Sequence, residues 1–394
     1  MSDKKTVVIT SAVRTAIGTL GGTLKNIPAY KLGSAVISSA IKKSNLKTSD
    51  INEIIMGQVL TGGTGQNPAR QAAMDSGVPK ETPSYVVNQV CGSGLRSIAS
   101  GFHSILSDNS KIVLTGGQES MSQAPHVAHL RNGKKLGDTE LIDSMIKDGL
   151  WDAFNGYHMG ITAENVATKF QVTRDQQDRF ALSSQEKAIK AQEENKFKDE
   201  IVNFKIKSKK SEVNFNKDEH PRDGINIEAL KRLKPVFKKD GTVTAGNAST
   251  INDGASALIL MSADKALELG ITPLAKINSF ADAAQEPEWF TTAPAKAVPI
   301  AVAKAGLAMN DVDYWELNEA FSVVGLANIK KLGLDAEKVN VNGGAVSLGH
   351  PLGNSGSRIV VTLINVLKQN NGKYGAAGIC NGGGGASSII IQSV

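Results

Sequence analysis

The sequence predicts an α/β protein built from two copies of one unit, with a polar segment inserted between them. Strand-like and helix-like runs alternate through the first 119 residues, which is typical of a largely parallel sheet covered by helices. A similar order of segments returns in the last third of the chain. Residues 120–247 are more polar and include a stretch crowded with Lys and Glu at 187–210, which we interpret as a solvated face.

The first part contains six segments with a regular pattern. The expected strands are residues 6–10, 51–60, 85–90 and 111–115. The expected helices are residues 31–43 and 95–106, where apolar side chains recur on one face. The strand at 111–115 is expected to end at Gly116-Gly117.

Short matches at a nearly constant offset indicate the repeat. Residues 50–53 (DINE) compare with 311–314 (DVDY) at an offset of 261. Residues 94–96 (GLR) compare with 356–358 (GSR) at an offset of 262, and each is expected to start a helix. Matches in the same chain order predict a duplicated unit.

The repeat suggests three domains. One half comprises residues 1–119 plus 248–271, the inserted loop domain comprises 120–247, and the other half comprises 272–394. The 394 residues are enough for two or three domains with large cores.

Composition excludes several classes of protein. The net charge is +6, but aromatic residues make up only 5% and no basic run contains interleaved aromatics, so no nucleic-acid partner is expected. No Cys-x-x-Cys occurs, so no zinc pattern is present. No apolar stretch approaches the ~20 residues of a membrane span, and the first ten residues lack a signal-peptide core. We therefore expect no membrane partner and a cytoplasmic protein with reduced thiols.

The two cysteines, 289 positions apart, each precede glycines. Cys91 lies between an expected strand and an expected helix, where the helix macrodipole would favour a thiolate. His350, in Gly349-His350-Pro351, is a candidate general base for it. The alternative is that Cys91 is a small buried hydrophobe, although flanking glycines are a poor choice for a packed core.

Cys380 is expected to follow a strand at 374–379 and to be followed by Gly382-Gly383. A second thiol could act as general base and acid at a carbon beside a carbonyl. The alternatives are an inert thiol and a flexible glycine turn. Asn318 could hold a water against an enolate oxygen, or could cap a helix. The histidines given a structural or exposed interpretation are His103, His126, His129 and His220.

Six motifs together resemble the thiolase family, most closely its short-chain acetyl-CoA acetyltransferases, over nearly the whole chain. These motifs are Asn88–Leu95, Gly116–Ser122, Asn318–Phe321, Asn342–Ala345, Gly349–Pro351 and the Cys380 loop. The resemblance implies a thiolase fold and a Claisen condensation of two acetyl-CoA molecules, reversible as thiolysis of acetoacetyl-CoA, with ping-pong kinetics. It implies no metal and no cofactor, because coenzyme A is a substrate and product. It also implies a homo-oligomer, either a dimer or a tetramer.

The resemblance also assigns roles to residues. Cys91 would be acetylated with His350 as its activator, and Cys380 would be the acid and base for the second substrate. One oxyanion hole would use His350 with a water held by Asn318, and the other the N–H groups of Cys91 and Gly382. The implied substrate-binding residues are Leu150, His158, Met159, Arg222, Phe237, Ala245, Gly246, Ser249, Ala320 and Phe321.

Some positions depart from the family pattern. Thr250, Asn354 and Phe290 differ from the commonest family residues, and Asn381 and Gly385 fall at positions that vary. Two other functions stay open at this point. One is a ketoacyl synthase of the same fold that decarboxylates malonyl thioesters, and the other is a non-catalytic acyl-CoA-binding protein.

Overall fold

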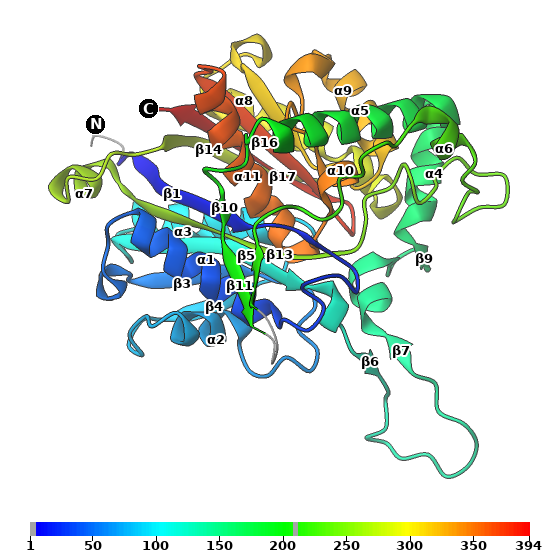
Figure 1. The fold of residues 1–394 in the computed structure, drawn as a ribbon, viewed down its shortest axis with the longest axis horizontal. Coiled ribbons are helices and arrows are strands. Elements are labelled where there is room, and N and C mark those ends of the chain that lie inside the picture. The colour runs from blue at the N-terminus through cyan, green and yellow to red at the C-terminus, as the bar shows by residue number, and fades with distance from the viewer. Residues whose placement is uncertain (1–4, 208–211) are drawn as a thin grey trace.

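One large mixed sheet organises the molecule (Figure 1). The structure is a computed structural model that describes residues 5–207 and 212–394. The main strands are β1 (Val7–Thr15), β3 (Glu53–Gly57), β4 (Ser84–Val87), β5 (Ile112–Ser120), β13 (Asn252–Ser262), β14 (Ala275–Ala284), β15 (Tyr314–Leu317), β16 (Tyr374–Asn381) and β17 (Gly385–Ser393). Their order across the sheet is β15-β16-β17-β14-β1-β13-β5-β3-β4.

The strands form two sets with the same order and directions, except that β4 has no counterpart in the second set. In the first set β4, β3 and β5 are parallel, and β13 runs antiparallel to both β5 and β1. In the second set β15 and β16 are parallel, and β17 runs antiparallel to both β16 and β14. The sets meet where β1 pairs antiparallel with β14. The predicted α/β class with duplicated halves is therefore confirmed. The expectation of a largely parallel sheet was wrong, because β1, β13, β14 and β17 pair antiparallel with their neighbours.

Two helices lie between the halves. The helices α3 (Ser93–Leu106) and α11 (Leu352–Gln369) pack on each other and on strands of both sets. The outer face of the first set is covered by α1 (Ala29–Lys43) and α2 (Pro68–Asp75), and that of the second by α8 (Pro294–Lys304). Because α11 is enclosed by both halves, it is buried from Leu352 to Leu367.

Two sequence-based boundaries were wrong. Gly116 and Gly117 lie inside β5, not after it, because the backbone of the other half passes close by. A Cβ on Gly117 would lie 2.2 Å from the carbonyl oxygen of Gly353, and glycine in mid-strand is typical of such an approach. The helix expected to start at residues 356–358 starts at Leu352 instead, since Pro351 already occupies its N-cap position.

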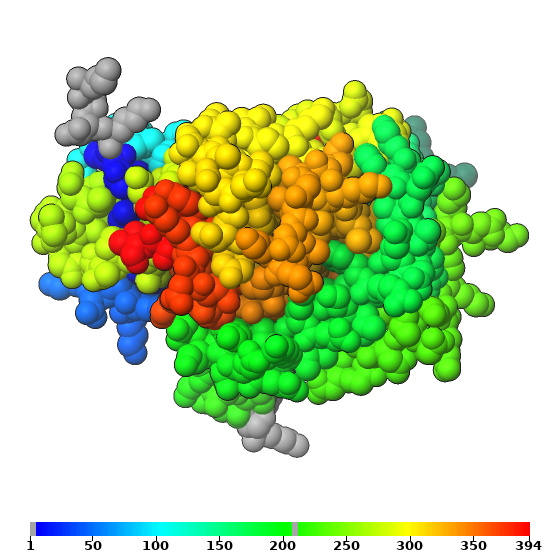
Figure 2. Space-filling view, turned by 90° about the horizontal axis from the view of Figure 1, so that it is seen from above, coloured from blue at the N-terminus to red at the C-terminus, as the bar shows by residue number. Residues whose placement is uncertain are grey.

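The segment between the halves forms short strands and helices around the site. Its elements are η2 (Met121–Gln123), β6 (His126–Val127), β7 (Ile142–Asp143), η3 (Met145–Leu150), β8 (Trp151–Asp152), β9 (Tyr157–His158), α4 (Met159–Lys169), α5 (Arg174–Glu193), β10 (Ile201–Val202), β11 (Phe204–Lys207), β12 (Glu212–Phe215) and α6 (Ile227–Lys231). An arm projects from the body beyond β6 and β7 (Figure 1). In Figure 2, the green residues of this segment lie against the orange residues of the second half, and α5 packs on α9 (Ser322–Leu332) and α10 (Ala345–Leu348).

Most charged side chains of the stretch at 187–210 are exposed where the structure describes it, but Glu200 is buried. Lys190, Glu193 and Lys198 face solvent, while Ala188 and Ala191 are buried. Residues 208–210 of that stretch lie outside the described residues.

Arg14 ties the inserted segment to the sheet. β10 pairs in parallel with the end of β1. The buried Arg14 guanidinium donates to Glu200 at 2.6 Å and to both carboxylate oxygens of Asp218 at 2.7 and 2.9 Å. Glu200 also accepts hydrogen bonds from Thr362 and Asn365 of α11. One buried ion cluster therefore joins the insertion to the helix at the centre of the molecule.

Candidate active site

Cys91 lies in a strained loop (residues 88–93) between β4 and α3. Val90 has a φ of +48°, a left-handed conformation that is rare for a β-branched residue. The Val90 N–H donates to Asn88 Oδ1 at 2.9 Å, and Ser93 Oγ donates to the Val90 carbonyl oxygen at 2.5 Å. These bonds hold the turn that carries Cys91. We call residues 88–93 the nucleophile loop.

The Cys91 thiol is buried, and burial decides its protonation state. Only 7% of the residue is exposed. Burial raises the pKa of Cys91 to about 12, although hydrogen bonds from the backbone N–H groups of Gly382 and Cys91 itself oppose the shift. The expectation of a thiolate favoured by the helix dipole was therefore wrong. The desolvation of an anion outweighs the helix terminus, and Cys91 is a neutral thiol at neutral pH.

His350 precedes the first turn of α11 and is also neutral. Its Nδ1 lies 2.6 Å from Ser355 Oγ, and the Ser355 hydroxyl donates its own proton to the Pro351 carbonyl at 2.9 Å. The hydroxyl therefore accepts from Nδ1–H, which leaves the lone pair on Nε2. Burial, with a contribution from Arg358, lowers the pKa of His350 to about 3. The ring is thus a neutral base with Nε2 available.

Asn318 faces this ring from the end of β15. Its Nδ2 lies 3.5 Å from His350 Nε2. Its Oδ1 is buried and has no hydrogen-bond partner within residues 5–207 and 212–394, so it is free to accept from a small molecule. The helix-cap interpretation is wrong, because the N-cap of the following helix is Phe321.

Cys380 is the last residue but one of β16. It therefore lies inside the strand and does not follow it as expected. It is fully buried in an apolar cluster with Met159, Phe290 and Phe321. Burial raises the pKa of its thiol, and a negative charge on Cys91 raises it further. The two thiols are therefore close enough to influence each other.

Two of the glycines after Cys380 have left-handed backbone conformations. Gly383 and Gly384 have φ values of +88° and +100°, and a Cβ on Gly384 would lie 2.1 Å from the carbonyl oxygen of Gln285. The turn from β16 to β17 thus requires glycine. It directs the Gly382 N–H toward the Cys91 sulfur.

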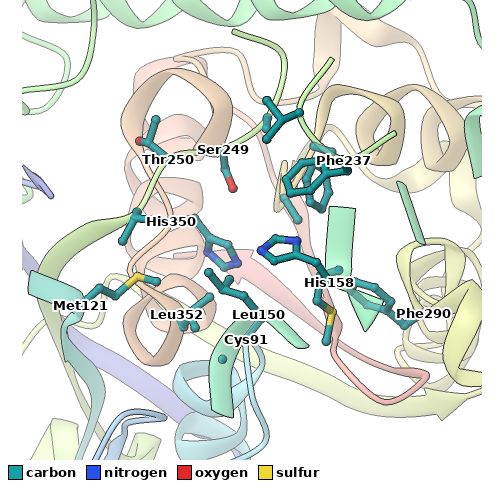
Figure 3. Close-up of a pocket in the computed structure, with 17 residues that line it drawn as sticks. Cys91, Met121, Leu150, His158, Phe237, Ser249, Thr250, Phe290, His350 and Leu352 are labelled. Atoms are coloured by element: carbon teal, nitrogen blue, oxygen red, sulfur yellow. The ribbon is translucent and has the colours of Figure 1, made fainter. Parts of the chain in front are cut away.

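A cavity of about 290 Å³ brings most of the predicted residues together (Figure 3). Its lining includes nine of them, namely Cys91, Leu150, His158, Met159, Phe237, Ser249, Ala320, Phe321 and His350. Arg222 and Ala245 line a neighbouring cavity that shares Phe237 and Ser249, and Gly246 lines a third beside Arg222. Cys380, Asn318 and Gly382 do not line the first cavity and lie behind its wall.

Aromatic rings form one wall of the cavity. His158 stacks on Phe237 with ring centroids 4.6 Å apart, and Phe237 meets Phe321 edge-to-face at 6.2 Å. A Cβ on Gly160 would lie 2.2 Å from the Phe237 ring, so glycine there lets the ring pack. The wall is therefore built from closely packed aromatic rings.

Two family profiles cover the chain. The profile described as "Thiolase, N-terminal domain" matches residues 7–264, and "Thiolase, C-terminal domain" matches residues 271–393. The chain belongs to the thiolase family.

Individual thiolases match over their full length. The acetyl-CoA acetyltransferase of Rhizobium meliloti is 49% identical, with 98% of each chain covered. Among solved structures, the acetyl-CoA acetyltransferase of Bacillus anthracis matches with a TM-score of 0.98 at 41% identity, covering 100% of both chains. Human mitochondrial 3-ketoacyl-CoA thiolase matches with a TM-score of 0.96, also at 41% identity, covering 99% of both.

Sequence reasoning missed several residues of this thiolase pocket. Met121, Val236, Ile251 and Leu352 line the cavity but were not predicted. Met121 lies inside the Gly116–Ser122 motif, and Leu352 directly follows Gly349-His350-Pro351. Position within or next to a motif was therefore the signal available for these two residues.

The described residues contain neither a candidate metal site nor a helix that could span a membrane. Within residues 5–207 and 212–394, no three His, Cys, Asp or Glu side chains are grouped so that they could hold a metal ion. In the same residues, none of the helices has the length and apolar character needed to cross a membrane.

Proposed function

We propose that this thiolase is an acetyl-CoA acetyltransferase that condenses two acetyl-CoA molecules to acetoacetyl-CoA and CoA through an S-acetyl group on Cys91, and that it also catalyses the reverse thiolysis. The observation that carries the proposal is a neutral thiol and a neutral imidazole in one buried pocket, with a second thiol behind the wall. A neutral pair suits general-base activation, since the proton leaves the thiol only as sulfur attacks.

In the first half-reaction, His350 Nε2 accepts the Cys91 proton while Cys91 sulfur attacks the thioester carbonyl. The oxyanion lies against the N–H groups of Cys91 and Gly382, which already point at the sulfur. The carbon–sulfur bond to CoA then breaks, and the CoA sulfur takes the proton of the Cys380 thiol. This leaves Cys380 as a thiolate and the Cys91 proton on His350 Nε2.

In the second half-reaction, Cys380 as thiolate removes a proton from the methyl carbon of a second acetyl-CoA. Acetylated Cys91 cannot carry the negative charge that would raise the pKa of Cys380 further. His350 and a water on Asn318 Oδ1 stabilise the enolate oxygen. The enolate attacks the acetyl carbon, and the proton on His350 Nε2 passes to the departing Cys91 sulfur. The methyl proton stays on Cys380, so both thiols and the neutral imidazole are restored.

The pocket supports a short acyl group and a CoA substrate. The cavity of about 290 Å³ is lined by Met159 and Phe290, of which Phe290 is fully buried. Ser249, Ala245, Gly246 and the cationic Arg222 line the outer cavities, where the rest of CoA would bind. The chemistry uses protein groups and the substrates, so we propose that it needs no cofactor.

Thiolysis of acetoacetyl-CoA by CoA, followed as loss of substrate absorbance, tests this function. We expect turnover with acetoacetyl-CoA and a steep fall with 3-ketoacyl chains longer than six carbons. Condensation from a malonyl thioester but not from acetyl-CoA would show a ketoacyl synthase. CoA binding without turnover would show an acyl-CoA-binding protein.

Domain boundaries at 1–119 plus 248–271, 120–247 and 272–394 remain our proposal. It is supported by β13, which follows the insertion and lies between β1 and β5 of the first half. Limited proteolysis should cut within 120–247 first.

We further propose a homo-oligomer, either a dimer or a tetramer. The support is the projecting arm, where Leu130, Leu136 and Leu141 are 56%, 91% and 63% exposed. Large apolar side chains grouped on an exposed segment favour a partner surface. Light scattering on the wild type and a Leu136→Ser variant tests it, and a monomeric wild type would contradict it.

A cytoplasmic location is also a proposal, supported by two free, buried thiols that the chemistry requires in reduced form. Cell fractionation tests it, and recovery with an organelle would contradict it.

A further inference from the structure

Residues of the second half hold the nucleophile loop on both sides of Cys91. Asp282 of β14 is at the centre of these contacts. Its Oδ2 pairs with Arg96 of α3 at 2.7 Å, and its Oδ1 accepts from Gln89 at 3.4 Å. The same Oδ1 accepts from Ser387 Oγ at 2.6 Å, and Ser387 accepts from Asn381 Nδ2 at 3.3 Å.

Asn381 completes this chain of contacts at Gly92. A Cβ built on Gly92 would lie 2.1 Å from Asn381 Oδ1, so the amide packs directly on the Gly92 backbone. Asn381 is 2% exposed, and its Oδ1 lacks a hydrogen-bond partner within the described residues. The residue also separates Cys380 from Gly382, whose N–H faces Cys91. One residue thus adjoins the nucleophile loop, the second thiol and an oxyanion donor.

In the first half, Glu119 occupies the strand position that corresponds to Asn381, and it also contacts a helix of the opposite half. Asn381 pairs with Gly385 across β16 and β17, and Glu119 pairs with Gly254 across β5 and β13. Glu119 accepts hydrogen bonds from the Val59, Leu60 and Gly353 N–H groups at 3.0, 3.2 and 2.8 Å. Glu119 therefore holds the first turn of α11 from across the interface between the halves, as Asn381 packs on the start of α3.

The serines next to these positions also correspond. The sequence Gly-Ala-Ser occurs at 254–256 and again at 385–387. Ser256 Oγ donates to Asn354 Oδ1 of α11 at 2.6 Å, whereas Ser387 bridges Asn381 and Asp282. Each half thus supports the helix of the other half through equivalent residues.

The left-handed conformation of Val90 makes such support necessary. A β-branched residue at positive φ persists only where the surroundings fix it. Asn88 and Ser93 fix it from within the loop, and the Asp282 contacts fix Gln89 and Arg96 on either side.

We propose that Asn381, linked through Ser387 to Asp282, is a positioning residue that sets the distance of the Cys91 sulfur from the Gly382 N–H and from the substrate carbonyl. The inference rests on the proposed acetylation of Cys91. It predicts a defect in the acetylation rate and not in CoA binding, because neither Asn381 nor Ser387 nor Asp282 lines the substrate cavities.

The test compares Ser387→Ala with Ser388→Ala. Both serines are fully buried neighbours in β17, but Ser388 donates only to the Ala377 carbonyl, away from the nucleophile loop. Rapid-quench mass spectrometry gives the acetylation rate at saturating acetyl-CoA, and calorimetry gives the dissociation constant of CoA. We expect Ser387→Ala to slow acetylation about 10- to 100-fold, the range expected for a reacting group displaced by about 1 Å, with CoA affinity unchanged. Ser388→Ala should match the wild type.

A second pair keeps the test valid if Ser387→Ala does not fold. Asp282 is partly exposed, so Asp282→Asn should fold and slow acetylation in the same sense. Its control, Asp175→Asn, alters another surface carboxylate paired to arginine at 2.7 Å, on α5. Equal rates in the wild type and both Asn381-linked variants would overturn the proposal, and so would a parallel loss of CoA affinity. A wild type that never becomes acetylated would instead overturn the proposed function on which the inference rests.

Discussion

Gly94 of α3 and Gly356 of α11 each lie against the backbone of the other helix where the two cross. A Cβ on Gly94 would lie 2.6 Å from the Ser357 nitrogen, and a Cβ on Gly356 would lie 2.4 Å from the Leu95 nitrogen. The contact is reciprocal because the two glycines are equivalent in the two halves. It sets the separation of the helix starts that present Cys91 and His350.

We expect Gly94→Ala to lower both stability and activity. The obstructing atoms are backbone, so the helices must separate, and overpacking of this kind costs about 1–3 kcal/mol. Urea denaturation measures the loss. Gly62→Ala is the matched control, since its Cβ would meet only Pro125 at 3.6 Å. Equal stability of the two variants would contradict the crossing as described.

Alkylation of Cys91 by iodoacetamide should rise with pH without a plateau up to pH 9. The pKa of Cys91 is raised to about 12 by burial, and only the thiolate reacts. The rate should therefore increase about tenfold per pH unit. The measurement uses the Cys380→Ser variant, so that Cys91 is the only thiol that iodoacetamide can alkylate. A plateau below pH 8 would show a preformed thiolate and an ion pair with His350.

The Glu119 carboxyl should make the protein less stable as pH rises from 4.5 to 7. Burial raises the pKa of Glu119 from 4.5 to about 7. In this window the folded state keeps a proton that the unfolded state has lost, so the free energy of unfolding falls with rising pH, by about 3 kcal/mol. Glu119→Gln should remove that fall.

The comparison with Glu119→Gln is needed because His350 acts in the opposite direction. Its lowered pKa makes the folded state more stable as pH rises between about 3 and 6.5, and this contribution is common to both proteins. Urea denaturation at several pH values gives the difference. A difference that does not change between pH 4.5 and 7 would contradict the assignment.

Arg14→Met should destabilise the fold by about 3–5 kcal/mol, because it leaves Asp218 and Glu200 buried without their cation. Arg179→Met removes an exposed arginine paired with Asp175 and should change the stability little. Chemical denaturation compares the two. Similar losses would mean that the Arg14 cluster does not anchor the insertion.

The sequence predicted the duplication from residues whose spacing survives in the structure. The offset of 262 between Gly94 and Gly356 matches the helix crossing. The family and the fold class were confirmed. A second signal, Gly-Ala-Ser at 254–256 and 385–387, was present in the sequence but was not recognised, because the insertion breaks the constant offset.

The remaining site features depend on packing that no local pattern encodes. The neutral state of Cys91 follows from burial by residues of both halves, whereas the sequence shows only its place before a helix. Contacts such as Asn381 with Gly92 join positions far apart in the chain. Cys380 lies inside β16 because the pairing of β16 with β17 continues as far as Asn381 and Gly385.

Peptide mass spectrometry after rapid acid quench of the enzyme with acetyl-CoA tests the central claim most directly. The account predicts a thioester-linked acetyl group on Cys91 in the wild type and in Cys380→Ser, and none in Cys91→Ala. An acetyl group on Cys380, or full condensation activity in Cys91→Ala, would contradict it.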